Sequence, residues 1–197
     1  MVRIKTAILI SGRGSNMKAL INAALSADFP AQIALVASNI EAAGGLAYAS
    51  DHGIKTLVVN HRNFANRELF ERQLDHELRQ HQIELVCLAG FMRVLTPWFV
   101  EQWQCRLINI HPSLLPLFKG LHTHEAALAA GVKNHGCTVH YVVPDVDAGE
   151  IIAQASVPIL AGDSPEILAA RVLEQEHIIY PQALAKIATA LIKQKSH

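Results

Sequence analysis

The sequence predicts an α/β fold in three layers, with helices on both faces of a doubly wound, mostly parallel sheet. Short apolar runs alternate regularly with amphipathic segments along the 197-residue chain. Hydrophobic residues make up 51% of the chain, which is typical of strands that are covered on both faces. Several of the apolar runs end in glycine-rich or polar turns, where open α/β sheets bind ligands. We expect one domain over residues 1–197.

The first half of the chain is predicted to be Rossmann-like, with strands and helices in strict alternation. Buried apolar runs predict strands at Thr6–Ser11, Ile33–Ala37, Thr56–Val59 and Leu85–Ala89. Between them we expect helices from about Asn16 to Leu25, from Gly45 to Asp51 and from about Asn66 to His81. The third helix is the clearest, because its leucines and Phe70 recur at helical spacing.

The second half contains a further strand at Leu107–Ile110, and Thr96 is expected to cap a short helix that Pro97 opens. After residue 136 the pattern changes. Two strands, Thr138–Val143 and Ile151–Val157, are joined by an acidic loop. A last helix is predicted from about Ser164 to Lys193, with an interruption at Pro181 because proline has no amide hydrogen.

Composition excludes several classes of function. Seventeen basic and seventeen acidic residues cancel, so no overall positive field favours a nucleic acid. No run reaches the roughly 18 apolar residues of a membrane span, and Met1 to Lys5 lead straight into a strand without a leader pattern. The three cysteines are far apart. We therefore expect a cytoplasmic protein without nucleic-acid or membrane partners.

The strongest local signal lies at the end of the strand that precedes Pro112. Side chains alternate along a strand, so Asn109 and His111 should point to the same side at its carboxyl end. An amide donor beside an imidazole suits a reaction that builds negative charge on a carbonyl oxygen and moves a proton. A buried strand with a polar end is the alternative reading.

The turn Gly12-Arg13-Gly14-Ser15-Asn16 joins the first strand to the first helix and is a candidate anion site. It lacks the Gly-Lys-Ser/Thr of a Walker loop, and Met17 stands at the third glycine position of a dinucleotide fingerprint. The turn therefore suits a single phosphate better than a dinucleotide. The alternative is a tight turn in which Ser15 or Asn16 caps the helix.

Two other segments have a candidate function. The run Gly90–Leu95 follows a strand end and combines apolar side chains with exposed backbone, which suits a flat heteroaromatic ring. Packing of Phe91 and Met92 into the core is an equally good reading. In the acidic loop, a carboxylate brought to His111 would hold its ring, although solvated turn acids are common.

Histidines are numerous, with eleven in the chain, and they raise the question of a metal site. His122 and His124 beside Asp145 or Asp147 have ligand chemistry for zinc. No HExxH motif is present, and no cysteine lies at ligand spacing. We therefore predict no metal, and we expect His122 and His124 to be hydrogen-bonding loop residues around a polar pocket.

These segments together resemble the phosphoribosylglycinamide (glycinamide ribonucleotide) formyltransferase family, within the folate-dependent formyltransferase superfamily. The resemblance covers nearly the whole chain in order. It rests on Ser11–Asn16, Leu88–Arg93, Asn109–Pro116, Gly120–His124, Gly136–His140, Asp147-x-Gly149 and Glu174–Pro181.

The resemblance implies a seven-stranded sheet whose sixth strand is antiparallel. It implies formyl transfer from 10-formyltetrahydrofolate to the amine of glycinamide ribonucleotide, a step of de novo purine (IMP) biosynthesis that yields formylglycinamide ribonucleotide, by a monomer or homodimer. Asn109, His111 and Asp147 would carry the chemistry, and Gly14, Ser15, Asn16 and Glu176 would bind the ribonucleotide. The folate would be held by Arg67, Met92, Arg93, Val94, Leu95, Asn109, Val143 and Asp147.

Other functions remain open at this point. A formyltetrahydrofolate hydrolase on the same scaffold would use water in place of the amine. A folate- or nucleotide-binding protein without catalysis is a second alternative, and a zinc hydrolase is a more distant one. The presence of Asn109, His111 and Asp147 favours an active enzyme.

Overall fold

Seven strands form a single sheet in the computed structural model, which describes residues 2–195. The strands are β1 (Ile4–Ile10), β2 (Ala31–Ser38), β3 (Lys55–Val58), β4 (Leu85–Leu88), β5 (Leu107–His111), β6 (Asn134–Tyr141) and β7 (Ile151–Pro158). Their order is β3-β2-β1-β4-β5-β6-β7. Strands β1 to β5 pair in parallel, whereas β6 is antiparallel to both of its neighbours. The doubly wound sheet and its antiparallel sixth strand are confirmed; the predicted domain limits at Met1 and His197 lie outside the described residues.

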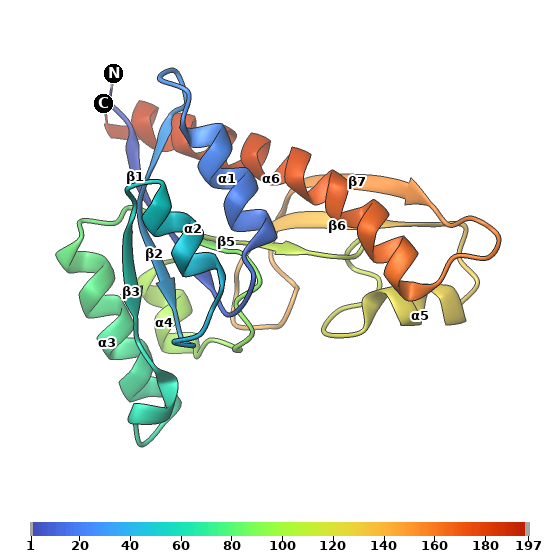
Figure 1. Cartoon of the computed structure of the whole chain (residues 1–197), viewed down its shortest axis with the longest axis horizontal. Coiled ribbons are helices and arrows are strands. Elements are labelled where there is room, and N and C mark those ends of the chain that lie inside the picture. The colour runs from blue at the N-terminus through green and yellow to red at the C-terminus, as the bar shows by residue number, and fades with distance from the viewer. Residues whose placement is uncertain (1, 196–197) are drawn as a thin grey trace.

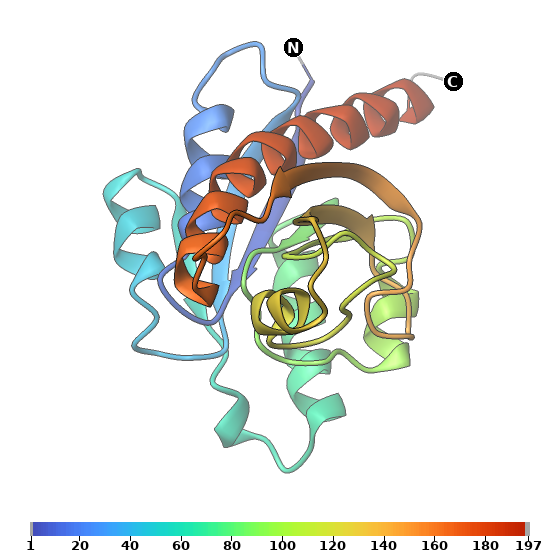
Figure 2. The ribbon, with the colours of Figure 1, turned by 90° about the vertical axis from the view of Figure 1, so that its right-hand side faces the viewer.

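Helices cover both faces of the sheet, so the fold has the predicted three layers (Figures 1 and 2). One face is covered by α1 (Ser15–Ala24), α2 (Gly45–Asp51) and the long α6 (Pro165–Lys195). The other face is covered by α3 (Arg67–Gln80) and α4 (Pro97–Gln102). A short α5 (Thr123–Ala129) contacts α6, and a 3₁₀ turn, η1, spans His61–Asn63. Among residues 2–195, no helix combines the length and the apolar character needed to cross a membrane.

Alternation along the strands separates the hydrophobic core into two halves. In β1, Ile8 and Ile10 pack under α1 and α6, while Ala7 and Leu9 pack under α3 and α4. The buried Tyr180 hydroxyl of α6 donates to backbone oxygens in β4 and β5, at 2.9 and 3.3 Å. The long helix is therefore fixed to the centre of the sheet.

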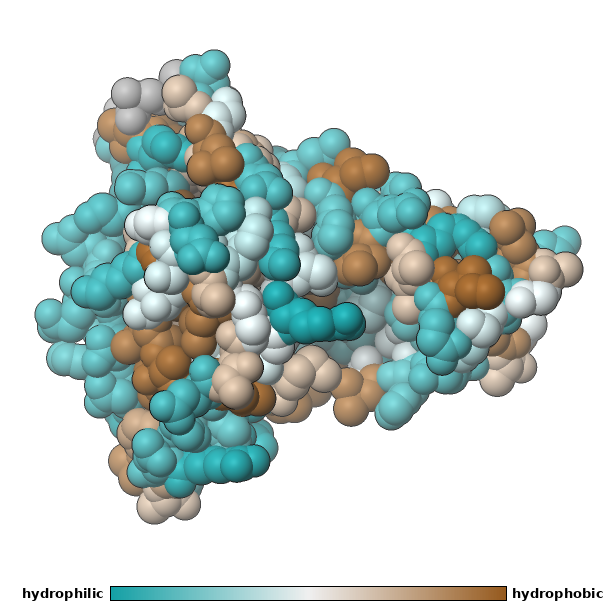
Figure 3. All heavy atoms as spheres, viewed as in Figure 1, coloured by the Kyte–Doolittle hydropathy of each residue, from teal (hydrophilic) through white to brown (hydrophobic). Residues whose placement is uncertain are grey.

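Figure 3 shows a mostly hydrophilic face over α1 and α2, hollowed between α1 and the part of the chain that carries α5.

Three local expectations were wrong or shifted. Helix α6 continues through Pro181, because the lost backbone hydrogen bond is outweighed by burial of Tyr180, Ala183 and Leu184 on either side of it. The strand predicted from Thr138 begins four residues earlier, as β6. Residues 123–129 form a helix that was not predicted. By contrast, the Thr96 hydroxyl caps α4 as expected, with Pro97 in the first turn.

The sheet order creates a crevice at the carboxyl ends of β1 and β4, where the chain connections diverge to opposite sides. Ser11 joins the two loops that begin there: its amide donates to the Gly90 carbonyl (3.1 Å), and its hydroxyl accepts from the Met92 amide (2.9 Å). The same hydroxyl donates to Asn39 after β2 (2.6 Å). The loops after β1, β2 and β4 are thus held in one fixed arrangement around the crevice.

A glycine in β6 gives a test of the pairing between β6 and β7. A Cβ atom at Gly136 would overlap the backbone carbonyl oxygen of Ala155 and lie 2.8 Å from Leu114 Cδ2. Because a backbone oxygen cannot move without separating the strands, Gly136→Ala should lower the free energy of unfolding by roughly 1–3 kcal/mol. Denaturant titration measures this. Gly44→Ala is the control, since its Cβ would meet nothing within 4 Å; equal midpoints for the two variants would contradict the prediction.

Candidate active site

Strand β5 delivers two polar side chains to one side of the sheet, as predicted. Ile108 and Ile110 enter the core under α1 and α6, so Asn109 and His111 point to the opposite face. The strand ends at His111, before Pro112. The face is open here because α3 and α4 cover the sheet nearer to β1 and β4, and the His111 ring is nonetheless only 5% exposed.

The antiparallel strand β6 adds a third polar group to the same face. Its register places His140 opposite Asn109 and Thr138 opposite His111. His140 is 2% exposed, and its Nε2 lies 3.3 Å from Asn109 Nδ2. The other ring nitrogen, Nδ1, lies 2.8 Å from the Tyr141 carbonyl oxygen. The amide of β5 and the imidazole of β6 therefore form one buried polar pair.

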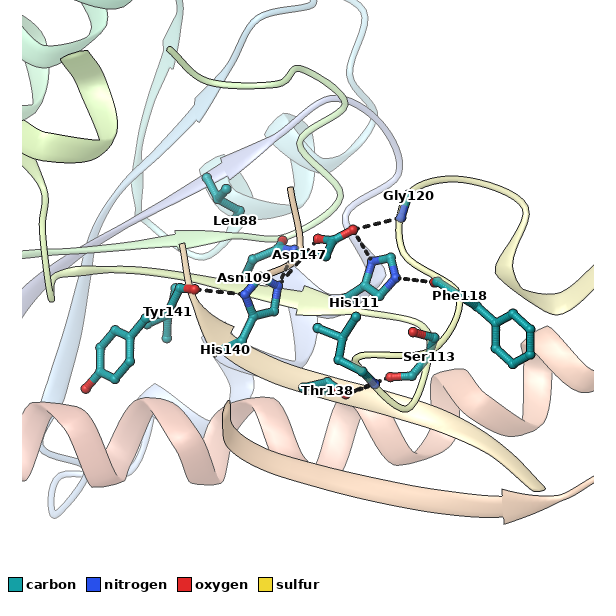
Figure 4. A network of polar contacts seen from close by, with 12 residues as sticks. Leu88, Asn109, His111, Ser113, Phe118, Gly120, Thr138, His140, Tyr141 and Asp147 are labelled. Carbon is teal, nitrogen blue, oxygen red and sulfur yellow. Dashed lines mark hydrogen bonds and ion pairs between the residues drawn. The ribbon is translucent and has the colours of Figure 1, made fainter. Parts of the chain in front are cut away.

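The carboxylate of Asp147 reaches back to both histidines from the loop after β6 (Figure 4). Its Oδ2 lies 3.4 Å from His111 Nδ1 and accepts a hydrogen bond from the Gly120 amide at 2.9 Å. Its Oδ1 lies 3.6 Å from His140 Nε2. The backbone at Asp147 is left-handed, with φ of 48°, and this bend turns the carboxylate inward. Asp145 and Glu150 in the same loop are exposed.

The Asp147 carboxyl is expected to be ionised. Burial by itself favours the neutral acid, but polar contact with His140, the Gly120 hydrogen bond and the charge of His111 outweigh it. Together they lower the pKa of this carboxyl below its ordinary value. The site thus contains a fixed negative charge beside the His111 ring.

Both nitrogens of His111 face oxygen atoms. Nδ1 faces Asp147, and Nε2 lies 3.0 Å from the carbonyl oxygen of Phe118. A carbonyl oxygen and an ionised carboxylate can only accept hydrogen bonds. The doubly protonated ring satisfies both contacts, whereas a neutral ring would point a lone pair at one of the oxygens.

A cavity of about 650 Å³ opens onto these groups. Asn109, His111, His140 and Asp147 line it, together with Gly90–Leu95, Gly120–Glu125, Val142–Pro144, Val146, Asn16 and Glu176. Met92 and Val94 are 67% and 54% exposed, so they offer apolar surface at the cavity rather than filling the core, while Phe91 packs against the core. Met92 therefore agrees with the prediction of a ligand-binding surface, whereas Phe91 agrees with the alternative of core packing. The cavity has an apolar side and a polar end, as small-molecule sites do.

A buried glutamate anchors the apolar side of the cavity. Glu71 of α3 accepts hydrogen bonds from the Thr96 amide (3.0 Å) and the Thr96 hydroxyl. Burial raises the pKa of Glu71 although these hydrogen bonds and the nearby charges of Arg67 and Arg93 oppose it. Arg93 lies over the Phe70 ring, with its guanidinium carbon 5.3 Å from the centroid. The segment that ends at Thr96 is thereby fixed to α3.

Arg67 does not line the cavity, so the structure does not place it among the other predicted folate residues. It is the first residue of α3, after the cap Asn66, and its side chain is exposed. Arg67 is outside the cavity because α3 begins after η1, beyond the crevice.

Two residues of the predicted phosphate turn, Ser15 and Asn16, line different hollows of the surface. Gly14 precedes α1 in a left-handed conformation, and no side chain caps the helix, so the structure does not have the cap by Ser15 or Asn16 that was the alternative reading. Asn16 lines the cavity and donates to Glu176 at 2.6 Å, while its Oδ1 is buried without a partner. Ser15 instead lines a groove between α1 and α6 with Arg13, Lys18 and His177. The amides at the start of α1 thus lie between the cavity and a positively charged groove.

His122 and His124 both line the cavity, but in and beside α5 rather than in a loop. His122 is the left-handed residue before the helix and contacts Glu125 at 3.3 Å, whereas His124 Nδ1 is buried without a partner. Within residues 2–195, no group of three or more histidine, cysteine or acidic side chains is arranged to hold a metal ion.

Sequence reasoning missed the roles of His140, the Gly120 amide and the Phe118 carbonyl. In the sequence, His140 is only the last residue of the matched segment Gly136–His140 and has no predicted role of its own. Its place follows from the β5–β6 register, which no short-range pattern encodes. The Gly120 and Phe118 contacts depend on loop backbone, to which any residue type contributes equally.

Comparison with known proteins gives consistent matches. The chain matches the formyl transferase family over residues 4–184. Phosphoribosylglycinamide formyltransferase of Escherichia coli (strain K12) is 45% identical over 186 residues, which cover 94% of this chain and 88% of that protein. The crystal structure of phosphoribosylglycinamide formyltransferase from Brucella melitensis is similar with a TM-score of 0.91 and 52% identity, and the match covers 94% of this chain and 96% of that one.

Longer relatives also match. The trifunctional purine biosynthetic protein adenosine-3 of Homo sapiens is 47% identical over 191 residues, which are 97% of this chain. The chain spans only 14% to 19% of the length of such trifunctional relatives.

Glu176 gives a stability test of the polar end of the cavity. Burial raises the pKa of its carboxyl, although the Asn16 hydrogen bond lowers it in part. The folded state therefore binds the proton more tightly than the unfolded state. Stability should be greatest below the ordinary glutamate pKa and should fall as pH rises from there to the raised pKa, by about 1.4 kcal/mol for each tenfold difference in proton affinity.

Glu176→Gln removes this titration but keeps an oxygen that can accept from Asn16 Nδ2. We expect the variant to lose this fall in stability and to be more stable than the parent at neutral pH, as measured by denaturant titration across the pH range. The control is Glu174→Gln, a change at an exposed position on the same helix. Parallel pH profiles for the parent and Glu176→Gln would contradict the prediction.

Proposed function

The chain belongs to the formyl transferase family, and we propose that it transfers a formyl group from 10-formyltetrahydrofolate to the amine of glycinamide ribonucleotide. The product would be formylglycinamide ribonucleotide, in de novo purine biosynthesis. The observation that carries the proposal is the convergence of Asn109, His111 and Asp147 on one cavity, in a chain 45% identical to a phosphoribosylglycinamide formyltransferase. We further propose that the protein acts in the cytoplasm as a monomer or homodimer.

The apolar side of the cavity suits the folate. Met92, Val94, Leu95 and Val143 would contact its flat rings, and the backbone of this segment would bind the ring edge. Arg93 would lie beside the same ligand. We assign Arg67 a lesser role than the resemblance implies: an exposed cation outside the cavity that is free to meet the folate carboxylates.

The polar end suits the ribonucleotide. The free amides of Gly14, Ser15 and Asn16 at the start of α1 would bind its phosphate, because a helix start attracts anions. Glu176 would accept from the ribose hydroxyls through the oxygen that does not bind Asn16. The amine of the substrate would then lie toward Asn109 and His111.

The side chains suggest how transfer proceeds. When the neutral amine attacks the formyl carbon, the formyl oxygen gains negative charge, and donors aimed at it lower the barrier. Asn109 Nδ2 is one donor. His111 is the other, by exchanging its Nε2 contact from the Phe118 carbonyl to the formyl oxygen. Asp147 balances the charge of the His111 ring throughout.

Collapse of the intermediate breaks the bond between the formyl carbon and N10 of the folate. The attacking amine loses a proton and N10 gains one, so no net proton is consumed. A water molecule near His111 and Asp147 would pass this proton. Much of the acceleration would come from holding the two substrates in line. The scheme uses the side chains of the site, the two substrates and one water molecule.

The rival function is hydrolysis of 10-formyltetrahydrofolate, with water as acceptor. The names of the relatives described above refer to transferases and purine biosynthesis, and they give no support to a hydrolase. The relevant measurement is turnover of 10-formyltetrahydrofolate with and without glycinamide ribonucleotide. We expect release of tetrahydrofolate to require the ribonucleotide, with formylation of its amine in equal amount. Release at the same rate without the ribonucleotide would establish the hydrolase, and absence of any turnover would favour a binding protein.

Asp147 tests the proposed chemistry. Asp147→Asn keeps the size of the side chain but removes the charge that faces His111, so the charged donor to the formyl oxygen is weakened. We expect kcat to fall roughly 10²–10⁴-fold, the scale of a lost acid–base element, with little change in either KM. Steady-state kinetics measure this. Glu150→Gln, which removes an exposed charge from the same loop, is the matched control; equal kcat values for the two variants would show that Asp147 serves only the turn.

A further inference from the structure

His140 has a position that formyl transfer by Asn109 and His111 does not by itself explain. Its side chain is 2% exposed at the polar end of the cavity. It lies on β6, opposite Asn109 of the neighbouring strand β5. We propose that His140 is a positioning residue that fixes the orientation of the Asn109 carboxamide, so that its NH₂ group, not its oxygen, faces the formyl oxygen. This proposal rests on the proposed function.

The tautomer of His140 follows from its contact with the main chain. Nδ1 lies 2.8 Å from the Tyr141 carbonyl oxygen, which can only accept. Nδ1 therefore carries the hydrogen, and in the neutral ring Nε2 presents a lone pair. The backbone of β6 determines which ring nitrogen acts as the acceptor.

The lone pair on Nε2 has two neighbours. Asn109 Nδ2 lies at 3.3 Å, within hydrogen-bond range, while the nearest oxygen of Asp147 lies at 3.6 Å, beyond it. Nε2 therefore accepts from Asn109. The opposite orientation of the amide would place Asn109 Oδ1 against the lone pair, with no hydrogen between two acceptors, so His140 selects one orientation of the amide.

This selection affects the reaction. The amide nitrogen has two hydrogens, and with one given to His140 the other remains for the cavity that Asn109 lines. A reversed amide would instead present Oδ1 lone pairs to the oxygen that becomes negative. Hydrogen bonds of this kind contribute mainly in the transition state, so loss of the orientation should lower kcat and leave the two KM values nearly unchanged.

Two substitutions separate orientation from simple packing. His140→Leu fills similar space without an acceptor, and we expect kcat to fall by roughly 10–10²-fold, at most the scale of a lost oxyanion donor. His140→Gln restores an acceptor oxygen and should recover most of the lost rate. His52→Leu is the control, because His52 makes the same 2.8 Å contact from ring nitrogen to backbone carbonyl but is an exposed residue at the end of α2. Equal kcat losses in the Leu and Gln variants would overturn the proposal.

A double-mutant cycle identifies the partner through which His140 acts. In an Asn109→Ala background, His140→Leu should lower kcat little further, because no amide remains to orient. In an Asp147→Asn background it should keep most of its effect. The proposal would be overturned if His140→Leu lowered kcat by the same factor in the Asn109→Ala background as in the parent. It would also be overturned if His140→Leu lost its effect on kcat only in the Asp147→Asn background.

A spectroscopic measurement tests the proposal without any substrate. Long-range ¹H–¹⁵N spectra of the histidine rings, assigned with His140→Gln, should show His140 with its hydrogen on Nδ1 and a lone pair on Nε2. A ring protonated at Nε2 overturns the orientation proposal even if the enzyme formylates glycinamide ribonucleotide. Conversely, absence of turnover with the expected tautomer would refute the proposed function and leave the assignment of the His140 ring in place.

Discussion

The contacts of the Asp147 carboxylate hold the catalytic end of the cavity together. One side chain connects the end of β5, the loop at Gly120 and, through His140, strand β6. These segments are distant in sequence, and without a charged group between them the His111 ring would face only the Phe118 carbonyl. A carboxylate buried to this extent is stable only where donors surround it, and here the Gly120 amide and the His111 ring do so. The position of the site and the charge of the site thus depend on the same interaction.

Buried carboxyl groups occur at both ends of the cavity, with opposite consequences. The contacts of Asp147 with Gly120 and the histidines lower its pKa, whereas burial outweighs the Thr96 hydrogen bonds of Glu71 and the Asn16 hydrogen bond of Glu176 and raises the pKa values of both carboxyls. Glu71 contributes structure by binding Thr96. Glu176 has one oxygen bound to Asn16 and lines the cavity, an arrangement that costs stability in the free protein and suits a ligand with hydroxyl groups.

Much of the fold could be predicted from the sequence because strand periodicity is a local property. The alternation that puts Asn109 and His111 on one side of β5 is one example, and the Thr96-Pro97 start of α4 is another. The errors have non-local causes. Pro181 stays helical because tertiary packing outweighs one missing hydrogen bond. His140 could not be assigned from its own surroundings in the chain, because only the strand register brings it to Asn109.

The antiparallel strand explains why a Rossmann-like sheet acquires this site. Because β6 runs opposite to β5, its last residues lie beside the beginning of β5: Tyr141 pairs with Ile108, and the Val142 amide donates to the Leu107 carbonyl. The chain must then return to start β7, whose first residue pairs with His140. The connection over residues 142–150 therefore passes along the face that bears Asn109 and His111, and the left-handed turn at Asp147 directs a carboxylate into it. Reversal of one strand thus closes the cavity and supplies its charge.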